Sequence, residues 1–301
     1  MAISQVRAQV NGTWHTLTYN SSTGKYEATI TAPGSTSFNL SGGYYNVKVE
    51  ATNTAGTVGT ADGGTISGLR LVVRERVAPV ITILSPSGGA YVSNSKQPVV
   101  FTVVDEAGGS GIDLSSLVVK QDGVAVASTA ISTTAITNGY SVTYTPATAL
   151  SDGSHTVTLS VSDNDGNAAE QKTTTYTVDT VPPTLNLSSP VDGLITATAS
   201  LNISGTTNDA TSSPVVIAVK LNGVDQGSVT VGANGSFSKT ITLANGSNTI
   251  EVTATDAAGK VSSVSRTVTL DTSVPKVVSA TITPNPVDAG ATMIISVEIS
   301  G

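Results

Sequence analysis

Cysteine is absent from the 301 residues of this sequence. Disulfide bonds, thiolate nucleophiles and cysteine-ligated zinc sites are therefore excluded. The absence leaves the cellular compartment open, because large β-sandwiches do not need disulfide bridges.

Charge is also scarce: charged residues make up 12% of the chain, and the net charge at pH 7 is −7. A pI near 4.7 argues against the broad basic surface that nucleic-acid binding needs. No apolar run approaches the roughly 20 residues that cross a bilayer, so we expect no membrane insertion. The first ten residues alternate like a strand and show no secretory signal, which favours assembly inside a cell.

The residues that are plentiful indicate an all-β protein. Aromatic residues are only 4% of the chain, whereas glycine occurs 29 times and β-branched residues are common. This composition is typical of strands joined by tight turns, and no ten-residue window shows a helical stripe. At roughly 100–150 residues per domain, the length predicts two to four domains.

Three segments of the chain repeat without gaps: 43–56, 153–166 and 246–259. Each opens and closes with glycines 13 residues apart, and apolar residues recur at every second position between them. That period predicts a strand with one buried face. Each run ends in an Asn/Asp-x-x-Gly turn, where glycine can take a positive φ.

A second repeat precedes the first one and predicts β-hairpins. Asn-Gly or Asp-Gly occurs at 11–12, 122–123 and 222–223, between alternating runs. Another glycine followed by an aromatic residue comes 12, 16 and 12 residues later, respectively. These later glycines are Gly24, Gly139 and Gly235.

Prolines mark the beginnings of new domains. The segments 79–86 and 183–190 each hold two prolines seven residues apart around one short strand, and proline belongs at strand ends or edges. Short proline-bearing linkers restrict bending, so we expect sandwiches of about seven strands in an extended, semi-rigid rod. The predicted domains are 1–77, 78–180, 181–273 and a strand pair at 274–301.

The segments 179–183, 151–158 and 253–259 resemble the bacterial immunoglobulin-like repeat families. The segments 10–20 and 24–33 resemble the opening repeat of phage tail-associated proteins from gut Firmicutes. The resemblance implies tandem immunoglobulin-like sandwiches. It also implies a place among surface adhesins, modules appended to glycan-active enzymes, or phage tail and capsid proteins.

The two ends of the chain look like parts of one domain. Segment 1–77 lacks the two strands that open the other domains, and 274–301 resembles those two strands. Three interpretations stay open: 274–301 completes the first domain of another copy, docks on a different virion protein, or is a truncated domain or loose hairpin. No single residue of this strand pair, Ala280 included, is assigned a role in assembly.

Calcium is the one cofactor for which the sequence contains candidate ligands. Asp163, Asp165 and Asn167 cluster oxygen ligands in one turn, and Asp179 lies in the linker that follows. Hard cations take six to eight such oxygens. The alternative interpretation is a turn rich in Asn and Asp, as the other repeats contain.

Other polar residues carry weaker predictions. Asp105 with Asp113 is a second calcium candidate. Asp105 and Glu106 are adjacent, and neighbours on a strand point to opposite faces, so we do not expect a carboxylate pair. His15 and His155 are expected at the surface or at strand ends, without a metal.

Trp14, Tyr44 and Tyr45 are candidates for glycan stacking on the first domain. At the strand period Tyr44 and Tyr45 face opposite ways, so one is expected in the core. The alternative is that all three pack within the domain or at a domain interface.

Together these features predict a non-enzymatic structural or adhesive protein, because no nucleophile, base and oxyanion donors occur in a recognisable pattern. The leading hypothesis is a phage tail or virion fibre component that assembles through terminal strand exchange. Its expected partners are copies of itself, other virion proteins and cell-surface glycans, in a virion or extracellular location. The alternative is a secreted adhesin or a carbohydrate-binding accessory module of a glycan-active enzyme.

Overall fold

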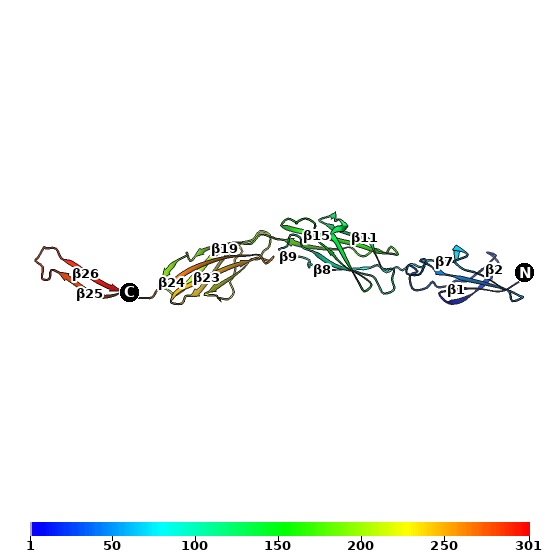
Figure 1. Ribbon diagram of the computed structural model, residues 1–301, viewed down its shortest axis with the longest axis horizontal. Coiled ribbons are helices and arrows are strands. Elements are labelled where there is room, and N and C mark those ends of the chain that lie inside the picture. The colour runs from blue at the N-terminus through cyan, green and yellow to red at the C-terminus, as the bar shows by residue number, and fades with distance from the viewer. Residues whose placement is uncertain (1) are drawn as a thin grey trace. The chain divides into compact units, whose positions relative to one another are not determined.

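The computed structural model describes residues 2–301, which divide into two compact units that meet between Val178 and Asp179. Nearly all regular structure is β-strand, and the only helical elements of the described residues are the 3₁₀ turns Ser67–Leu69 and Ser128–Ala130. None of residues 2–301 lies in a helix of the length and hydropathy needed to cross a membrane. We call β1–β7 the first module, β8–β16 the second, β17–β24 the third, and β25–β26 the C-terminal hairpin (Figure 1).

The first module is a five-stranded sheet in the order β3-β2-β1-β5-β6, with a separate pair formed by β4 and β7. Alternate residues of β1 are buried, but the module has few other buried apolar side chains. Its strands are β1 (Ile3–Val10), β2 (Thr13–Asn20), β3 (Lys25–Glu27), β4 (Tyr45–Asn46), β5 (Lys48–Asn53), β6 (Val58–Ala61) and β7 (Arg70–Leu71).

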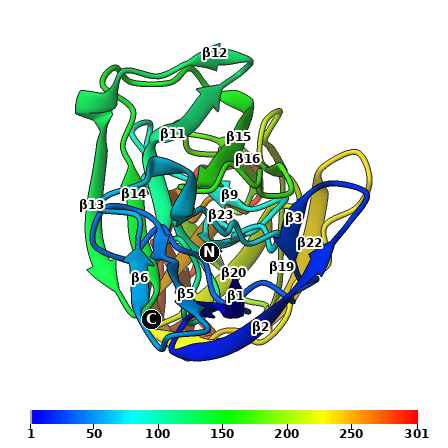
Figure 2. The same ribbon diagram turned by 90° about the vertical axis from the view of Figure 1, so that its right-hand side faces the viewer.

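The second module is a two-layer sandwich with sheets in the orders β13-β14-β10-β8 and β12-β11-β15-β16-β9 (Figure 2). Its core includes the fully buried Phe101, Leu159 and Tyr176. The strands are β8 (Val80–Ser85), β9 (Tyr91–Val92), β10 (Val99–Val104), β11 (Ile112–Gln121), β12 (Val124–Ala125), β13 (Ile131–Ile136), β14 (Gly139–Tyr144), β15 (Gly153–Asp163) and β16 (Lys172–Val178).

The third module repeats this plan with sheets in the orders β17-β19-β22 and β18-β24-β23-β20-β21. Its core packs around Phe237, Ile203 and Ile250. The strands are β17 (Thr184–Ser189), β18 (Leu194–Thr196), β19 (Ser200–Asn208), β20 (Val216–Leu221), β21 (Val224–Asp225), β22 (Ser236–Thr242), β23 (Gly246–Thr255) and β24 (Val261–Leu270).

The sequence repeats correspond to repeated structure. The alternating segments form β5, β15 and β23, and in β15 and β23 every second side chain is buried. The predicted Asn-Gly and Asp-Gly turns are present, because Asn11, Asp122 and Asn222 have φ between 47° and 50° in front of a positive-φ glycine. The pattern of paired left-handed residues is the one that tight hairpins require.

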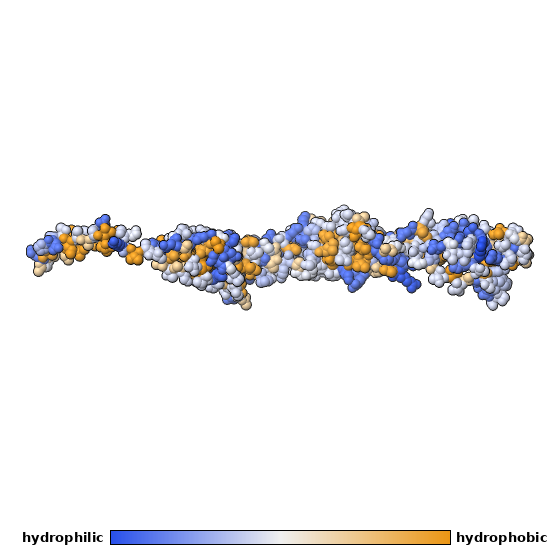
Figure 3. All heavy atoms as spheres, turned by 90° about the horizontal axis from the view of Figure 1, so that it is seen from below, coloured by the Kyte–Doolittle hydropathy of each residue, from blue (hydrophilic) through white to orange (hydrophobic). Residues whose placement is uncertain are grey.

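The C-terminal hairpin joins β25 (Lys276–Thr283) and β26 (Ile294–Ser300) in an antiparallel pair. One face is apolar, because Val277 pairs with Ile299, Ala280 with Val297, and Ile282 with Ile295. The opposite face carries mainly Ser, Thr and Glu side chains. Every residue of both strands is exposed, so the apolar face has no cover among residues 2–301 (orange spheres on the hairpin in Figure 3).

Candidate functional site

A first cluster of carboxylates lies where the chain leads into the second module. One oxygen each from Glu75, Asp105 and Glu106 lies within 4.8 Å of the other two. Asp105 is only 4% exposed, and among the described residues no donor reaches its Oδ1 atom. Its other oxygen, Oδ2, accepts a 2.7 Å hydrogen bond from the backbone N–H of Gly111.

The two glutamates of this cluster compete for one proton. A hydrogen bond to Glu75 and then burial raise the pKa of Glu106 to about 7. Burial opposes ionisation of Glu75 as well, but its hydrogen bonds to Glu106 and to Ser110 outweigh it and lower the pKa of Glu75. Glu106 is therefore the carboxyl of the pair that more readily holds the proton.

A second cluster lies where the chain leads into the third module. Oxygens of Asp179, Asp209 and Asp256 lie within 4.8 Å of one another, and the three residues are 0%, 9% and 6% exposed. Asp179 Oδ2 accepts a short hydrogen bond from the Ser212 hydroxyl. Asp256 Oδ1 accepts from the N–H of Lys260 at 2.8 Å, whereas Oδ2 has no donor among the described residues.

Of the four residues predicted as calcium ligands, Asp163 and Asn167 pair with each other, whereas Asp165 and Asp179 have other partners. Both oxygens of Asp163 accept hydrogen bonds from Asn167, at 2.8 Å each. Asp165 Oδ2 accepts from the Thr36 hydroxyl at 2.5 Å and from the N–H of Glu75 at 3.0 Å, which ties the first module to the second. Asp179 belongs to the other compact unit, in the second cluster.

The expectation that Asp105 and Glu106 face opposite ways was wrong. Alternation applies only within a strand, and β10 ends at Val104, so both side chains reach the same cluster. Asp113 does not join them, because its Oδ1 accepts hydrogen bonds from the N–H and hydroxyl of Ser115. No sequence motif pointed to Glu75 or Asp209, or to Asp256 as part of a carboxylate cluster.

The three aromatic residues predicted to bind glycan lie in different environments. Tyr45 is buried and its hydroxyl donates to the carbonyl oxygen of Ser35. The Arg7 guanidinium lies over the half-buried Trp14 ring, 4.3 Å from its centroid, and Arg70 lies 5.1 Å from that of Tyr44. Glycan contact by these residues stays a prediction.

A groove of about 390 Å³, lined by both polar and apolar surface, opens in the first module. It lies between β1, β7 and the segment 28–32, with Arg70 as the one charged residue of its lining. The apolar lining residues are Val10, Ala28, Ile30, Ala32, Val47, Leu69, Leu71 and Val72.

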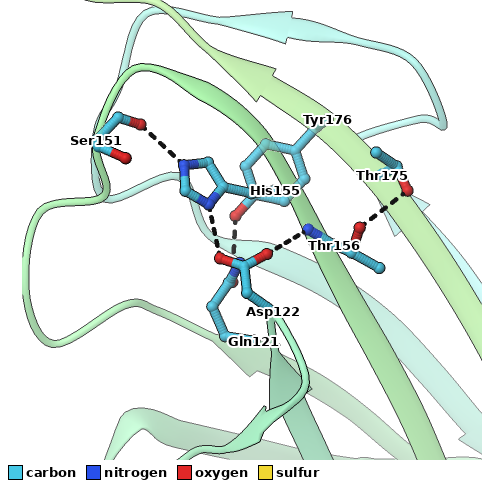
Figure 4. Close-up of polar contacts among 7 residues, drawn as sticks. All are labelled: Gln121, Asp122, Ser151, His155, Thr156, Thr175 and Tyr176. Carbon is cyan, nitrogen blue, oxygen red and sulfur yellow. Dashed lines mark hydrogen bonds and ion pairs between the residues drawn. The ribbon is translucent and has the colours of Figure 1, made fainter.

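His155 lies near the beginning of β15, at a strand end as expected, but it is buried and not at the surface (Figure 4). Its Nδ1 lies 2.7 Å from Asp122 Oδ2 and its Nε2 lies 2.8 Å from the carbonyl oxygen of Ser151. The serine hydroxyl takes no part in this contact. The arrangement therefore anchors the loop before β15 to the Asp122 turn and does not activate a nucleophile.

Replacing His155 by glutamine is expected to destabilise the protein more in weak acid than in base. Burial disfavours the imidazolium, but hydrogen bonds to Asp122 and Ser151 outweigh it and raise the pKa of His155. Burial likewise opposes ionisation of Asp122, yet its bond to His155 lowers the pKa of Asp122. The stability that the raised pKa of His155 contributes is present below the unfolded pKa of about 6.5 and is lost as the pH rises through the folded pKa. The stability that the lowered pKa of Asp122 contributes is present above the unfolded pKa of about 3.8 and is lost as the pH falls through the folded pKa.

Urea unfolding of H155Q and the wild type at about pH 5.5 and about pH 8 checks this expectation. We expect a loss of about 1 kcal/mol at the lower pH and less at the higher, a value discounted because the Asp122 side chain is 45% exposed. H15Q is the matched control, because His15 is a half-buried histidine in β2. Equal losses for H155Q at both pH values would contradict the assignment of the charged pair.

Comparisons with known proteins agree with the two-layer fold. Residues 92–180 match the family described as "Bacterial Ig-like domain", and residues 183–272 match the family described as "Glucodextranase, domain B". No curated protein sequence matches the chain.

The solved structures that match this chain have low sequence identity to it. The fibronectin(III)-like modules of Clostridium thermocellum CbhA are 17% identical, with 63% of this chain and 93% of that one covered and a TM-score of 0.43. Sidekick-1 immunoglobulin domains 1–5 are 14% identical, with 99% and 60% covered and a TM-score of 0.38. Bacteroides ovatus SGBP-B, solved with a mixed-linkage heptasaccharide, is 14% identical, with 92% and 62% covered and a TM-score of 0.24.

The second and third modules are immunoglobulin-like β-sandwiches, as the sheet orders and the first family match indicate. The chain is thus an all-β protein with tandem immunoglobulin-like repeats.

Proposed function

We propose that this chain is a non-catalytic structural or adhesive protein that assembles by strand exchange. In this proposal the apolar face of the C-terminal hairpin of one copy packs against the apolar side chains of the groove in the first module of another copy. The observation that carries it is the uncovered apolar face of the hairpin, on which Val277, Ile295 and Ile299 are 60%, 59% and 63% exposed.

The hairpin has the form of the strand pair that opens the other modules. Pro79, Pro183 and Pro275 each precede the first strand of such a pair. The pairs β8–β10, β17–β19 and β25–β26 are all antiparallel, and each contains one register shift. In the second and third modules this pair covers the core, whereas residues 2–78 contain no equivalent pair.

Burial of the hairpin supplies a driving force for association. Full burial of a Val or Ile side chain contributes about 1.5–3 kcal/mol, and an isolated two-stranded hairpin is marginal in water. In such a contact one copy contributes its hairpin and the other contributes its groove, so the two partners use different surfaces. A contact of this kind repeats head to tail and produces rings or filaments.

A fibre of a phage tail or virion is the biological setting that we propose, with copies of this chain or other virion proteins as partners. The resemblance of segments 10–20 and 24–33 to phage tail-associated proteins supports this setting. Repeated copies would also let weak contacts with cell-surface glycans act together.

The second candidate function is an accessory module of a glycan-active enzyme or a secreted adhesin. The match of residues 183–272 to domain B of a glucodextranase favours it. Binding of the full chain to a glycan array, abolished by Trp14→Ala, would support this candidate. Unchanged glycan binding in that variant would remove Trp14 from it.

Replacing Ile295 by aspartate is expected to weaken self-association at least tenfold, because a carboxylate would enter the apolar contact. Sedimentation velocity of the full chain measures the effect. The matched control is Ile195→Asp, which changes the same residue type at an exposed position of the third module, 70% exposed against 59% for Ile295. A wild type that stays monomeric at about 100 μM, or equal effects of both variants, would overturn strand exchange.

A further inference from the structure

We propose that the two carboxylate clusters are calcium sites, one formed by Glu75, Asp105 and Glu106 and the other by Asp179, Asp209 and Asp256. This inference is independent of strand exchange, since it concerns the segments that lead into the second and third modules.

The two clusters occupy the same place in the repeated fold. Glu75 and Asp179 each lie four residues before the proline that opens the next module, at Pro79 and Pro183. Asp105 and Asp209 each lie 26 residues after that proline. Two modules with different sequences thus bring a linker carboxylate to the carboxylate that follows their second long strand, β10 or β19.

The third ligand differs between the modules, and the structure shows a compensation. In the third module Asp256, in the turn after β23, completes the cluster. Its counterpart in the second module is Asp163, ten residues after the repeat glycine in both cases. Asn167 occupies both oxygens of Asp163 there, and Glu106 supplies the third carboxylate instead. The number of carboxylates is the same in both places although the residues are not.

Buried oxygens without donors point to a cation in each cluster. Asp105 and Asp256 are only 4% and 6% exposed. Each has one carboxylate oxygen that no donor of the described residues reaches. Buried carboxylates this close together repel one another and lose hydration, and a bound dication offsets both costs.

The ligand chemistry favours calcium over other metals. The clusters offer only carboxylate oxygens, which hard cations prefer, and neither contains histidine. Oxygens on opposite sides of a calcium ion, each about 2.4 Å away, are about 4.8 Å apart. The ligand oxygens here all lie within that separation of one another. A bound ion would hold each linker carboxylate against the module that follows it.

Calorimetric titration of the full chain with calcium chloride, after removal of metals with EDTA, tests the proposal. We expect two calcium ions per chain and, at about 5 mM calcium, a rise of about 5 °C in melting temperature. Sodium chloride at about 15 mM matches the ionic strength and should give no such rise. No binding and no shift in melting temperature at that calcium concentration would overturn the proposal.

Paired substitutions assign the sites. D105N and D209N should each remove one calcium, and the double variant both. Asparagine keeps an oxygen for the N–H donors that these residues accept from, Gly111 and Ser212. In EDTA each variant should be at least as stable as the wild type, because a like charge has been removed. The controls E170Q and D225N change exposed carboxylates of the same modules and should leave both ions bound.

The outcomes separate a cation site from a structural cluster. Variants that are folded in EDTA by far-ultraviolet circular dichroism and still bind two ions would overturn the assignment. Variants that unfold in EDTA would show that the carboxylates act as hydrogen-bond acceptors alone, which also contradicts the proposal.

Discussion

Alanine at Gly139 is expected to destabilise the second module by about 3 kcal/mol or more. A Cβ atom at this position would lie 2.0 Å from the carbonyl oxygen of Val103 and 2.9 Å from the Cα of Val104. Both are backbone atoms of β10, which lies between β14 and β8 in the sheet. A backbone cannot yield as a flexible side chain does, so the β10–β14 pairing would have to separate.

The equivalent glycines of the other modules provide an internal comparison. A Cβ at Gly235 would lie 2.0 Å from the carbonyl oxygen of Thr207, and its φ of +77° adds strain for any other residue. Gly24 also has a positive φ, +69°, but a Cβ there would have no atom within 4 Å. We therefore expect G235A to cost at least as much as G139A, and G24A only about 1 kcal/mol.

Denaturant unfolding of the three single variants in the full chain measures these differences. The contrast depends on the strands that face Gly139 and Gly235, which are β10 and β19. If G24A cost as much as G139A, the steric explanation would be wrong.

Alanine at Phe237 is expected to destabilise the third module by about 3–5 kcal/mol, because the ring fills the centre of a small core. Phe237 is 4% exposed and packs in the cluster that contains Ile203, Val219 and Ile250. Aromatic residues are few, and no second phenylalanine lies in this core to fill the cavity.

Differential scanning calorimetry of F237A should show one transition at a lower temperature while the transition of the second module is unchanged. The second module has its own core, with no residue shared between the two. Phe38→Ala is the matched control, since Phe38 is 48% exposed. A uniform shift of all transitions would mean that the modules unfold together.

The fold was predictable because its signals are local. The period of two in β15 and β23 depends on neighbours along the chain, and so does the left-handed pair at each Asn-Gly or Asp-Gly turn. Side-chain packing was less predictable. The aromatic residue after the second turn is buried in the case of Phe237, whereas Tyr140 is only partly buried against its core. The Tyr26 ring makes a tilted contact with that of Tyr19, with ring centroids 5.3 Å apart.

The carboxylate clusters were less predictable because they join residues far apart in the chain. Asp209 and Asp256 meet Asp179 only after β19 and β23 have been placed in opposite sheets. One signal was present in the sequence: the equal distances of Glu75 and Asp179 from the next proline, repeated 26 residues beyond it. Turn motifs alone directed attention to Asp163, whose oxygens are used within its own turn.

The burial of His155 shows the same limit. The sequence predicted an imidazole at the surface or at a strand end. The structure pairs it with Asp122, whose carboxylate comes from a turn 33 residues away along the chain. Only the pairing of β11 with β15 brings the two together.

Separate cores have a mechanical consequence. The interior of the second module and that of the third are closed clusters of side chains, with none in common. When the chain is pulled from its ends, one module can therefore rupture while the other keeps its packing. The stretched chain then lengthens in discrete steps and dissipates work at each one. It returns to its original, shorter length as each module refolds independently.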